Sequence, residues 1–206
     1  MRALRRLHLV RAPFLPHPIK AWDVLSTLTL LRDTCDLSDP ILDLGCKDSG
    51  VLPCLAVSGF RTLLGIDLDR SVLAQPTFGC IQWRVADLYH NGFQDSTFAA
   101  ISAISTIEHG LDTERLAAEM RRLLRPRGIF VFSTDYHALK LDTSEARPFG
   151  MEWTIFSRED MCDLLVTFEQ HGFEPLGNVS LEHDSAPIHW MGRDYTFLFG
   201  ALRKRG

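Results

Sequence analysis

The sequence lacks three patterns that would assign it to a specialised class of protein. None of its apolar runs approaches the roughly 20 residues that a helix needs to cross a bilayer. Its five cysteines are scattered and contain no C-x-x-C pair, so neither a disulfide framework nor a zinc knuckle is indicated. The net charge of -4 gives no overall reason to expect a polyanion as partner. We therefore expect a cytoplasmic protein with reduced thiols, no nucleic-acid partner and no membrane span.

The composition is that of a globular domain. A chain of 206 residues with 46% apolar and 23% charged residues can bury a substantial core. We predict a single domain over residues 1–206, with an N-terminal cap at 1–38, a cofactor-binding core at 39–136 and an acceptor-side segment with the last strands at 137–206. The basic start is interrupted by Arg11 and by prolines, and we interpret it as a mature N-terminus.

Apolar runs typical of strands alternate with helical patterns along most of the chain. Strands are predicted at 41–44, 62–66, 81–85, 98–104, 129–133 and 195–202, and helices at 22–32, 49–58, 112–126 and 157–172. This alternation predicts an α/β fold, a mostly parallel, doubly wound sheet with helices on both faces. Ligands of such sheets bind at the carboxyl ends of the strands, where this chain carries several acids.

The stretch ILDLGCKDSG, residues 41–50, combines a strand, an acid and a tight turn. Gly45 allows the backbone to turn after the strand, and Gly50 lets the next helix pack close to the sheet. A dinucleotide site needs G-x-G-x-x-G to admit a pyrophosphate, and the middle glycine is absent here. Asp48 would repel a phosphate, although Lys47 partly offsets that repulsion. A nicotinamide-dependent oxidoreductase is therefore a disfavoured alternative.

Further acids follow the next strands. Asp67 comes 24 residues after Asp43, where its carboxylate can accept hydrogen bonds from both hydroxyls of a ribose. Asp87 is placed to accept a hydrogen bond from an adenine amine, with Leu88 flanking the ring. Such an acidic rim suits a nucleoside that carries hydroxyls, amines and a positive charge better than one that carries phosphates.

In their order and spacing, these motifs resemble those of class I S-adenosylmethionine-dependent methyltransferases. The motifs that carry the resemblance are ILDLGCKDSG, LLGIDLD, VADLYH, FAAISAISTIEH and EMRRLLRPRGIFVFS, and together they cover residues 41–133. The resemblance implies a seven-stranded sheet with an antiparallel last strand, S-adenosyl-L-methionine as cofactor, and an enzyme of class EC 2.1.1. It also indicates the small-molecule and sugar type within that class.

The resemblance further implies cofactor contacts for nine residues: Asp43, Gly45, Cys46, Lys47, Asp67, Leu68, Asp87, Leu88 and Ser105. Asp43 and Gly45 would line the methionine end of the cofactor, and Ser105 would lie near it. Lys47 and Ser49 depart from the D-x-G-x-G-x-G pattern of the family, where small residues are usual. A degenerate, non-catalytic binding protein is therefore an alternative.

Methyl transfer to a hydroxyl needs a general base, because a neutral alcohol is a poor nucleophile. His109, in S-T-I-E-H-G after the fourth strand, is the predicted base, and Glu108 would orient it or act itself. We predict no metal, with a divalent ion on Glu108, His109, Asp135 and His137 as the open alternative.

The predicted acceptor is a small molecule or a sugar that is methylated on a hydroxyl. N-methylation of a small metabolite is the alternative reaction. Aromatic residues outside the nucleotide core are candidates for the wall of the acceptor pocket: Trp22, Trp153, Phe156 and Trp190.

Overall fold

The computed structural model describes residues 21–183 and 185–206. Residues 1–20, which include most of the predicted N-terminal cap and the start interpreted as a mature N-terminus, lie outside the described residues. The described strands are β1 (Pro40–Leu44), β2 (Thr62–Asp67), β3 (Ile81–Val85), β4 (Phe98–Ile104), β5 (Leu124–Tyr136), β6 (Phe173–Pro175), β7 (Ile188–Trp190) and β8 (Arg193–Lys204).

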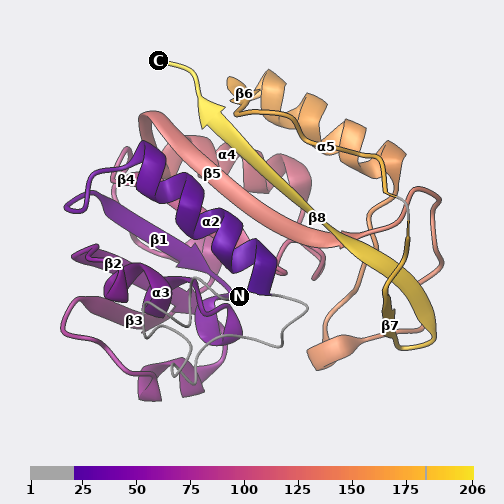
Figure 1. Ribbon diagram of the computed structural model, residues 1–206, viewed down its shortest axis with the longest axis horizontal. Helices are drawn as coiled ribbons and strands as arrows, with labels where there is room; N and C mark the ends of the chain where they lie inside the picture. Colours follow the sequence, from indigo (N-terminus) through magenta and orange to yellow (C-terminus); the bar gives the residue numbers. More distant parts are fainter. Residues whose placement is uncertain (1–20, 184) are drawn as a thin grey trace.

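The strands form one sheet in the order β3-β2-β1-β4-β5-β8-β6, with β7 paired to β8 beside this path (Figure 1). Neighbours from β3 to β5 pair in parallel. β8 runs antiparallel to β5, β6 and β7. The predicted mostly parallel sheet with an antiparallel last strand is confirmed, and β7 is a further short strand that the sequence pattern did not predict.

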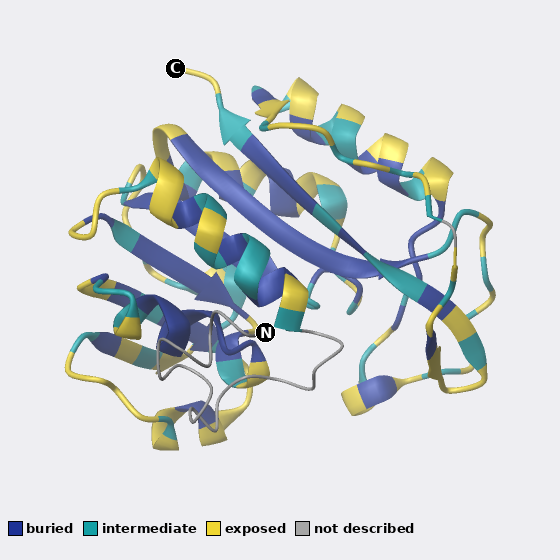
Figure 2. Cartoon of the chain, in the orientation of Figure 1, coloured by how far each residue is buried: buried dark blue, intermediate teal, exposed yellow. Residues whose placement is uncertain are grey.

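Helices cover both faces of the sheet: α2 (Ala21–Thr34), α3 (Val51–Val57), α4 (Thr113–Leu123) and α5 (Arg158–Gln170). Alternate strand residues point to opposite faces, so Leu42 and Phe130 pack with the α4 and α5 side chains. Ile41 and Val131 pack with α2 and α3 on the other face. Figure 2 shows the strands buried between these two layers. Burial on both faces explains why β1, β4 and β5 are nearly continuous apolar runs.

Two predicted helix starts are confirmed by their caps. The Asp112 side chain accepts a hydrogen bond from the Arg115 amide at 2.9 Å. Ser157 and Asp160 form a capping box at the start of α5. Such local signals are readable from sequence because the cap and its partner are three residues apart.

Two predicted boundaries are wrong for identifiable reasons. The helix expected from Ser49 begins at Val51, with Gly50 as its N-cap in the left-handed conformation. The Ser49 hydroxyl donates to Asp43 and accepts the Val51 amide, so Ser49 lies in the turn that precedes the helix. The helix predicted at 112–126, α4, ends at Leu123, and the chain enters β5 before Pro126. The pairing of β4 with β5 shifts register between Phe98 and Ala100, which accommodates the irregular start of β5.

Candidate cofactor and acceptor site

Asp43 on β1 is fully buried, and both of its carboxylate oxygens accept serine hydroxyls. Ser49 Oγ donates to Oδ2 at 2.5 Å, and Ser102 Oγ on β4 donates to Oδ1 at 2.6 Å. Burial raises the pKa of Asp43 to about 7, the two serine hydrogen bonds lower it, and the charge of Asp67 adds to the rise. This carboxyl therefore ties β1, its turn and β4 together. Its predicted contact with the methionine end of the cofactor stays a prediction.

The turn after β1 passes close to the next loop at Gly45. This glycine has a φ of 61°, and a Cβ added there would lie 2.5 Å from Thr106 Oγ1. The Thr106 hydroxyl donates to the Leu44 carbonyl at 3.1 Å, so it cannot easily move away. Position 45 therefore requires glycine both for its conformation and for its space.

Lys47 replaces a family glycine without forcing the backbone into the left-handed region, because it is not among the residues with positive φ. Its amide donates to Asp67 Oδ2 at 3.0 Å, and its ammonium pairs with Asp69 at 2.5 Å. The hydrogen bond from Lys47 contributes most to lowering the pKa of Asp69 to about 2. The long side chain thus leaves the turn and connects it to the loop after β2.

Cys46 is buried between the turn and β2. A Cβ added at Gly65 would lie 2.6 Å from its sulfur, so the turn and β2 approach closely at this point. Burial raises the pKa of the Cys46 thiol, and the charges of Asp43 and Asp67 raise it further. This cysteine is a protonated packing residue.

Asp67 ends β2 with its carboxylate half-buried. Oδ2 accepts the Lys47 amide, and Oδ1 accepts the Asp69 amide at 2.8 Å. Each carboxylate oxygen has a second lone pair, so both retain the capacity to accept a hydroxyl. Leu68, the next residue, is 63% exposed. An apolar side chain beside a hydrogen-bonding carboxylate is the combination that a nucleoside requires.

Asp87 follows β3 and caps the short turn Leu88–His90. Its Oδ1 accepts the Tyr89 amide at 2.8 Å and lies 3.1 Å from His90 Nδ1. The Leu88 side chain is partly buried against the core beneath α4. The predicted adenine-side residues therefore share one turn whose backbone is fixed by the acid itself.

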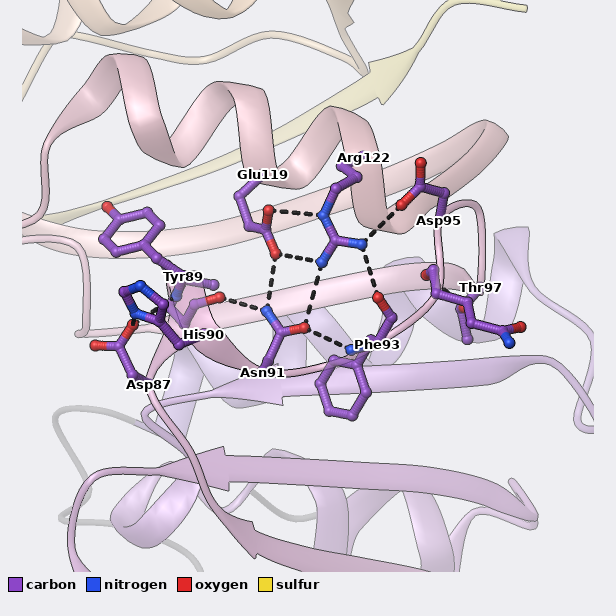
Figure 3. Close-up of polar contacts among 11 residues, drawn as sticks. Asp87, Tyr89, His90, Asn91, Phe93, Asp95, Thr97, Glu119 and Arg122 are labelled. Carbon is purple, nitrogen blue, oxygen red and sulfur yellow. Dashed lines mark hydrogen bonds and ion pairs between the residues drawn. The ribbon is translucent and has the colours of Figure 1, made fainter.

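Arg122 on α4 fixes the loop that follows this turn (Figure 3). Its guanidinium donates to both Glu119 oxygens, at 2.9 and 2.7 Å, and to Asp95 at 2.8 Å. Hydrogen bonds with these two carboxylates raise the pKa of Arg122. The Asn91 side chain links Glu119 to the Leu88 carbonyl. The position of Asp87 and Leu88 thus depends on a network that reaches α4.

Ser105 follows β4 with a φ of 49°, which is uncommon for a residue other than glycine. Its amide donates to the Ser133 carbonyl at 3.0 Å. Its own hydroxyl oxygen is buried and has no hydrogen-bond partner among the described residues. Because buried hydroxyls normally have a partner, this atom is suited to receive a ligand group.

Glu108 and His109 lie in the loop after β4 and point to different surroundings. Glu108 is 1% exposed, and its Oε2 accepts the Thr134 hydroxyl at 3.4 Å. His109 is half-buried, and its ring lies 5.7 Å from the ring of Phe149. The carboxylate is thus enclosed against β5, whereas the imidazole borders the acceptor-side segment.

The four aromatic residues predicted to wall the acceptor pocket separate into two groups. Trp153 and Trp190 contact each other, with ring centroids 5.1 Å apart. Trp22 packs against Phe199 of β8, and Phe156 belongs to the core beneath α4 and α5. Trp190 is the member of this set that adjoins Phe149, the ring in contact with His109.

Two residues of this region were missed from the sequence. Phe149 contacts His109, but nothing in its local pattern distinguishes it from a loop residue. Asp23 is fully buried and accepts a hydrogen bond from Ser133 Oγ at 2.9 Å. An acid on the apolar face of a helical pattern, between Trp22 and Val24, was the available signal for Asp23.

No three His, Cys, Asp or Glu side chains of the described residues come together as a group that could hold a metal ion. The alternative set of Glu108, His109, Asp135 and His137 is therefore not assembled.

Residues 21–183 and 185–206 also contain no helix that is long and apolar enough to cross a membrane. The five cysteines are free thiols.

Residues 42–132 match the family model described as a methyltransferase domain. No curated protein sequence matches the chain. The match covers the strands and turns that carry Asp43, Asp67, Asp87 and Ser105.

Solved structures share the fold at low sequence identity. A S-adenosylmethionine-dependent methyltransferase from Mesorhizobium loti is 20% identical with a TM-score of 0.62, over 85% of this chain and 96% of that one. Phosphoethanolamine N-methyltransferase 2 of Haemonchus contortus, in complex with S-adenosyl-L-methionine, is 13% identical with a TM-score of 0.64, over 88% of this chain and 53% of that one. The cyclase SpnF is 17% identical with a TM-score of 0.66, over 90% of this chain and 82% of that one.

The chain shares its fold with these S-adenosylmethionine-dependent methyltransferases, and a methyltransferase-domain model matches its central part. Because a cyclase shares the fold, the reaction has to be argued from the residues of the site.

Ser49→Ala should destabilise the protein by about 1–3 kcal/mol, because a buried carboxyl loses a donor. The folded pKa of Asp43 lies above its ordinary value, so this carboxyl is protonated at about pH 5 and ionised at about pH 8. A donor stabilises the ionised form more, so we expect the larger loss of unfolding free energy at about pH 8. Urea denaturation at both pH values measures it. Ser180→Ala, at an exposed serine, is the control, and equal losses at both pH values would contradict the assignment.

Arg122→Met should free the loop of residues 88–97 and lower the unfolding free energy by about 1–3 kcal/mol, because Glu119 and Asn91 lose their partner. Hydrogen–deuterium exchange should show faster exchange in this loop than in β1 or β4. Arg61→Met, at an exposed arginine, should leave exchange unchanged. Wild-type protection of the loop in Arg122→Met would show that Arg122 does not hold it.

Proposed function

We propose that the chain is an S-adenosylmethionine-dependent methyltransferase that methylates a hydroxyl of a small molecule or sugar. The observation that carries the proposal is the half-buried Asp67 carboxylate beside the Gly45 turn, because its oxygens can each accept a further hydrogen bond. The turn itself lacks the glycine pattern that a pyrophosphate requires. N-methylation of a small metabolite is the alternative reaction, and both would proceed at the same rim of the sheet. We also propose a cytoplasmic location for the enzyme.

The described residues fit the proposed cofactor. Asp67 would hold the ribose hydroxyls, Leu68 and Leu88 would flank the adenine, and Asp87 would accept its amine. Ser105 has a buried, unpartnered hydroxyl oxygen that would meet a polar group of the methionine moiety. The turn that contains Asp43, Gly45, Cys46 and Lys47 would lie against the methionine moiety of the cofactor.

Lys47 and Ser49 do not weaken this proposal. Each makes a hydrogen bond or ion pair that a glycine could not make, Ser49 to Asp43 and Lys47 to Asp69. These contacts stabilise the turn in place of the small residues usual in the family. A degenerate, non-catalytic binding protein stays the alternative.

When bound, S-adenosylmethionine supplies an electrophilic methyl group. The chain's residues have to align the acceptor with that group, exclude water and remove a proton. Positioning of this kind can lower the barrier by roughly 7–11 kcal/mol. We assign proton removal to His109, whose ring borders the acceptor-side segment. Glu108, in the same loop, would orient His109 or act as the base itself.

Asp67→Ala should weaken the binding of S-adenosylhomocysteine about 5–100-fold, because ribose hydroxyls lose their acceptor at about 1–3 kcal/mol. Isothermal titration calorimetry measures the change. Asp48→Ala removes an exposed acid from the same turn and should bind like the wild type. Unchanged affinity in a folded Asp67→Ala protein would remove Asp67 from the site.

His109→Ala should lower kcat about 10²–10⁴-fold while the affinity for S-adenosylhomocysteine stays within about twofold, because the base acts on the acceptor. Release of S-adenosylhomocysteine with an accepted substrate measures turnover. His171→Ala, near the end of α5, is the matched histidine control. Wild-type turnover of His109→Ala would exclude it as the base.

A further inference from the structure

We propose that Phe149 and Trp190, beside His109, form an acceptor site for a planar aromatic molecule that carries a phenolic hydroxyl. The proposal rests on the function proposed above and names the class of its acceptor. It depends on a row of rings, on their exposure and on the conformation of the turns that carry them.

Aromatic rings form a continuous row from the loop after β4 to the β7–β8 hairpin. The His109 ring lies 5.7 Å from Phe149, and Phe149 lies 6.4 Å from Trp190. Trp190 lies 5.1 Å from Trp153, which lies 5.9 Å from Tyr195. Figure 1 shows the short turn before α5 and strand β7 on the same side of the molecule. The predicted base is thus the first member of an aromatic surface.

The two ends of this row differ in exposure. Trp153 and Tyr195 are 2% and 3% exposed, and the Trp153 indole donates to the buried Asp135 at 2.8 Å. Phe149 is 80% exposed and Trp190 is 38% exposed. The buried rings of Trp153 and Tyr195 anchor one end of the row. The exposed rings of Phe149 and Trp190, at the end nearer His109, present apolar surface to a ligand.

The Phe149 ring is carried by a turn in an uncommon conformation. Phe149 has a φ of 57°, which makes this bulky residue an outlier, and such outliers concentrate at ligand sites. Trp190 ends β7, and the two residues that join β7 to β8, Met191 and Gly192, both have positive φ, as a two-residue hairpin turn requires. The hairpin thus sets the position of the Trp190 ring.

The chemistry beside His109 favours a phenol over an alcohol. A phenolic hydroxyl has a pKa of about 10, far closer to that of an imidazole than the pKa of an alcohol is. The phenol oxygen forms the new bond to the methyl carbon as the bond from that carbon to the sulfonium sulfur breaks. The electron pair of the broken bond stays on sulfur, the phenolic proton passes to His109, and the imidazolium then releases it to water.

A sugar would need polar partners for several hydroxyls, and the acids next to the ring row are buried. Glu108 is 1% exposed and Asp135 is 4% exposed. Polar side chains do line a pocket of ≈ 550 Å³ that Trp153 borders, among them Arg147 and Glu152. A sugar that binds there is the competing outcome for the test.

Calorimetry with 2-naphthol as the ligand tests the site. We expect wild-type protein to bind 2-naphthol in preference to methyl glucoside, both with and without S-adenosylhomocysteine. Phe149→Ala and Trp190→Ala should each weaken naphthol binding about tenfold, as expected for a lost aromatic pair. Phe149→Leu should weaken it comparably, because the ring rather than the apolar volume is recognised. Val166→Ala, an exposed apolar side chain on α5, is the control.

Two results would overturn the proposal. One is naphthol binding that is unchanged in Phe149→Ala and Trp190→Ala, both checked for folding by circular dichroism. The other is methyl glucoside that binds more tightly than naphthol and loses affinity in Arg147→Ala. Wild-type protein that binds naphthol but not S-adenosylhomocysteine would contradict the proposed function and leave the aromatic site standing.

Discussion

The buried carboxyl of Asp43 is the contact on which the site depends. It receives Ser102 from β4 and Ser49 from its own turn, so one side chain joins two central strands and the loop between strand and helix. A buried carboxyl without these donors would be costly, and its pKa of about 7 shows that burial already opposes its charge. The turn is therefore built around a buried acid whose hydrogen-bond donors have to come from the protein itself.

The rest of the rim follows from this anchor. The fixed turn presents the Lys47 amide to Asp67, which orients the carboxylate proposed for the ribose. On the adenine side, Arg122 holds the loop after Asp87 from a different helix. The two halves of the proposed nucleoside site are thus positioned independently, one by β1 and β4 and the other by α4.

Much of the fold could be predicted because its signals are local. The order of strands and helices follows from the spacing of apolar residues, and Asp112 and Ser157 cap the helices predicted from them. The short strand β7 was missed because three residues carry no periodicity, and its stability comes from pairing with β8. The start of α3 was misplaced because the left-handed conformation of Gly50, which begins the helix at Val51, depends on the turn packed around Asp43.

The candidate site could be predicted in part for the same reason. Asp67 and Asp87 follow strands, and strand ends are readable from sequence. The ring contact of Phe149 with His109 joins residues 40 positions apart in a segment without regular pattern, so no sequence signal pointed to it. The unpartnered hydroxyl of Ser105 is likewise a property of packing, although the residue itself was predicted from its motif.

The most direct measurement is calorimetry of the wild-type protein with S-adenosylhomocysteine and, separately, with NAD⁺. A turn that lacks the pyrophosphate glycine and presents Asp67 and Asp87 should bind S-adenosylhomocysteine at least about 100-fold more tightly than NAD⁺, a difference of about 2.8 kcal/mol. Tight binding of NAD⁺ with no heat from S-adenosylhomocysteine would contradict the proposed cofactor and with it the reaction.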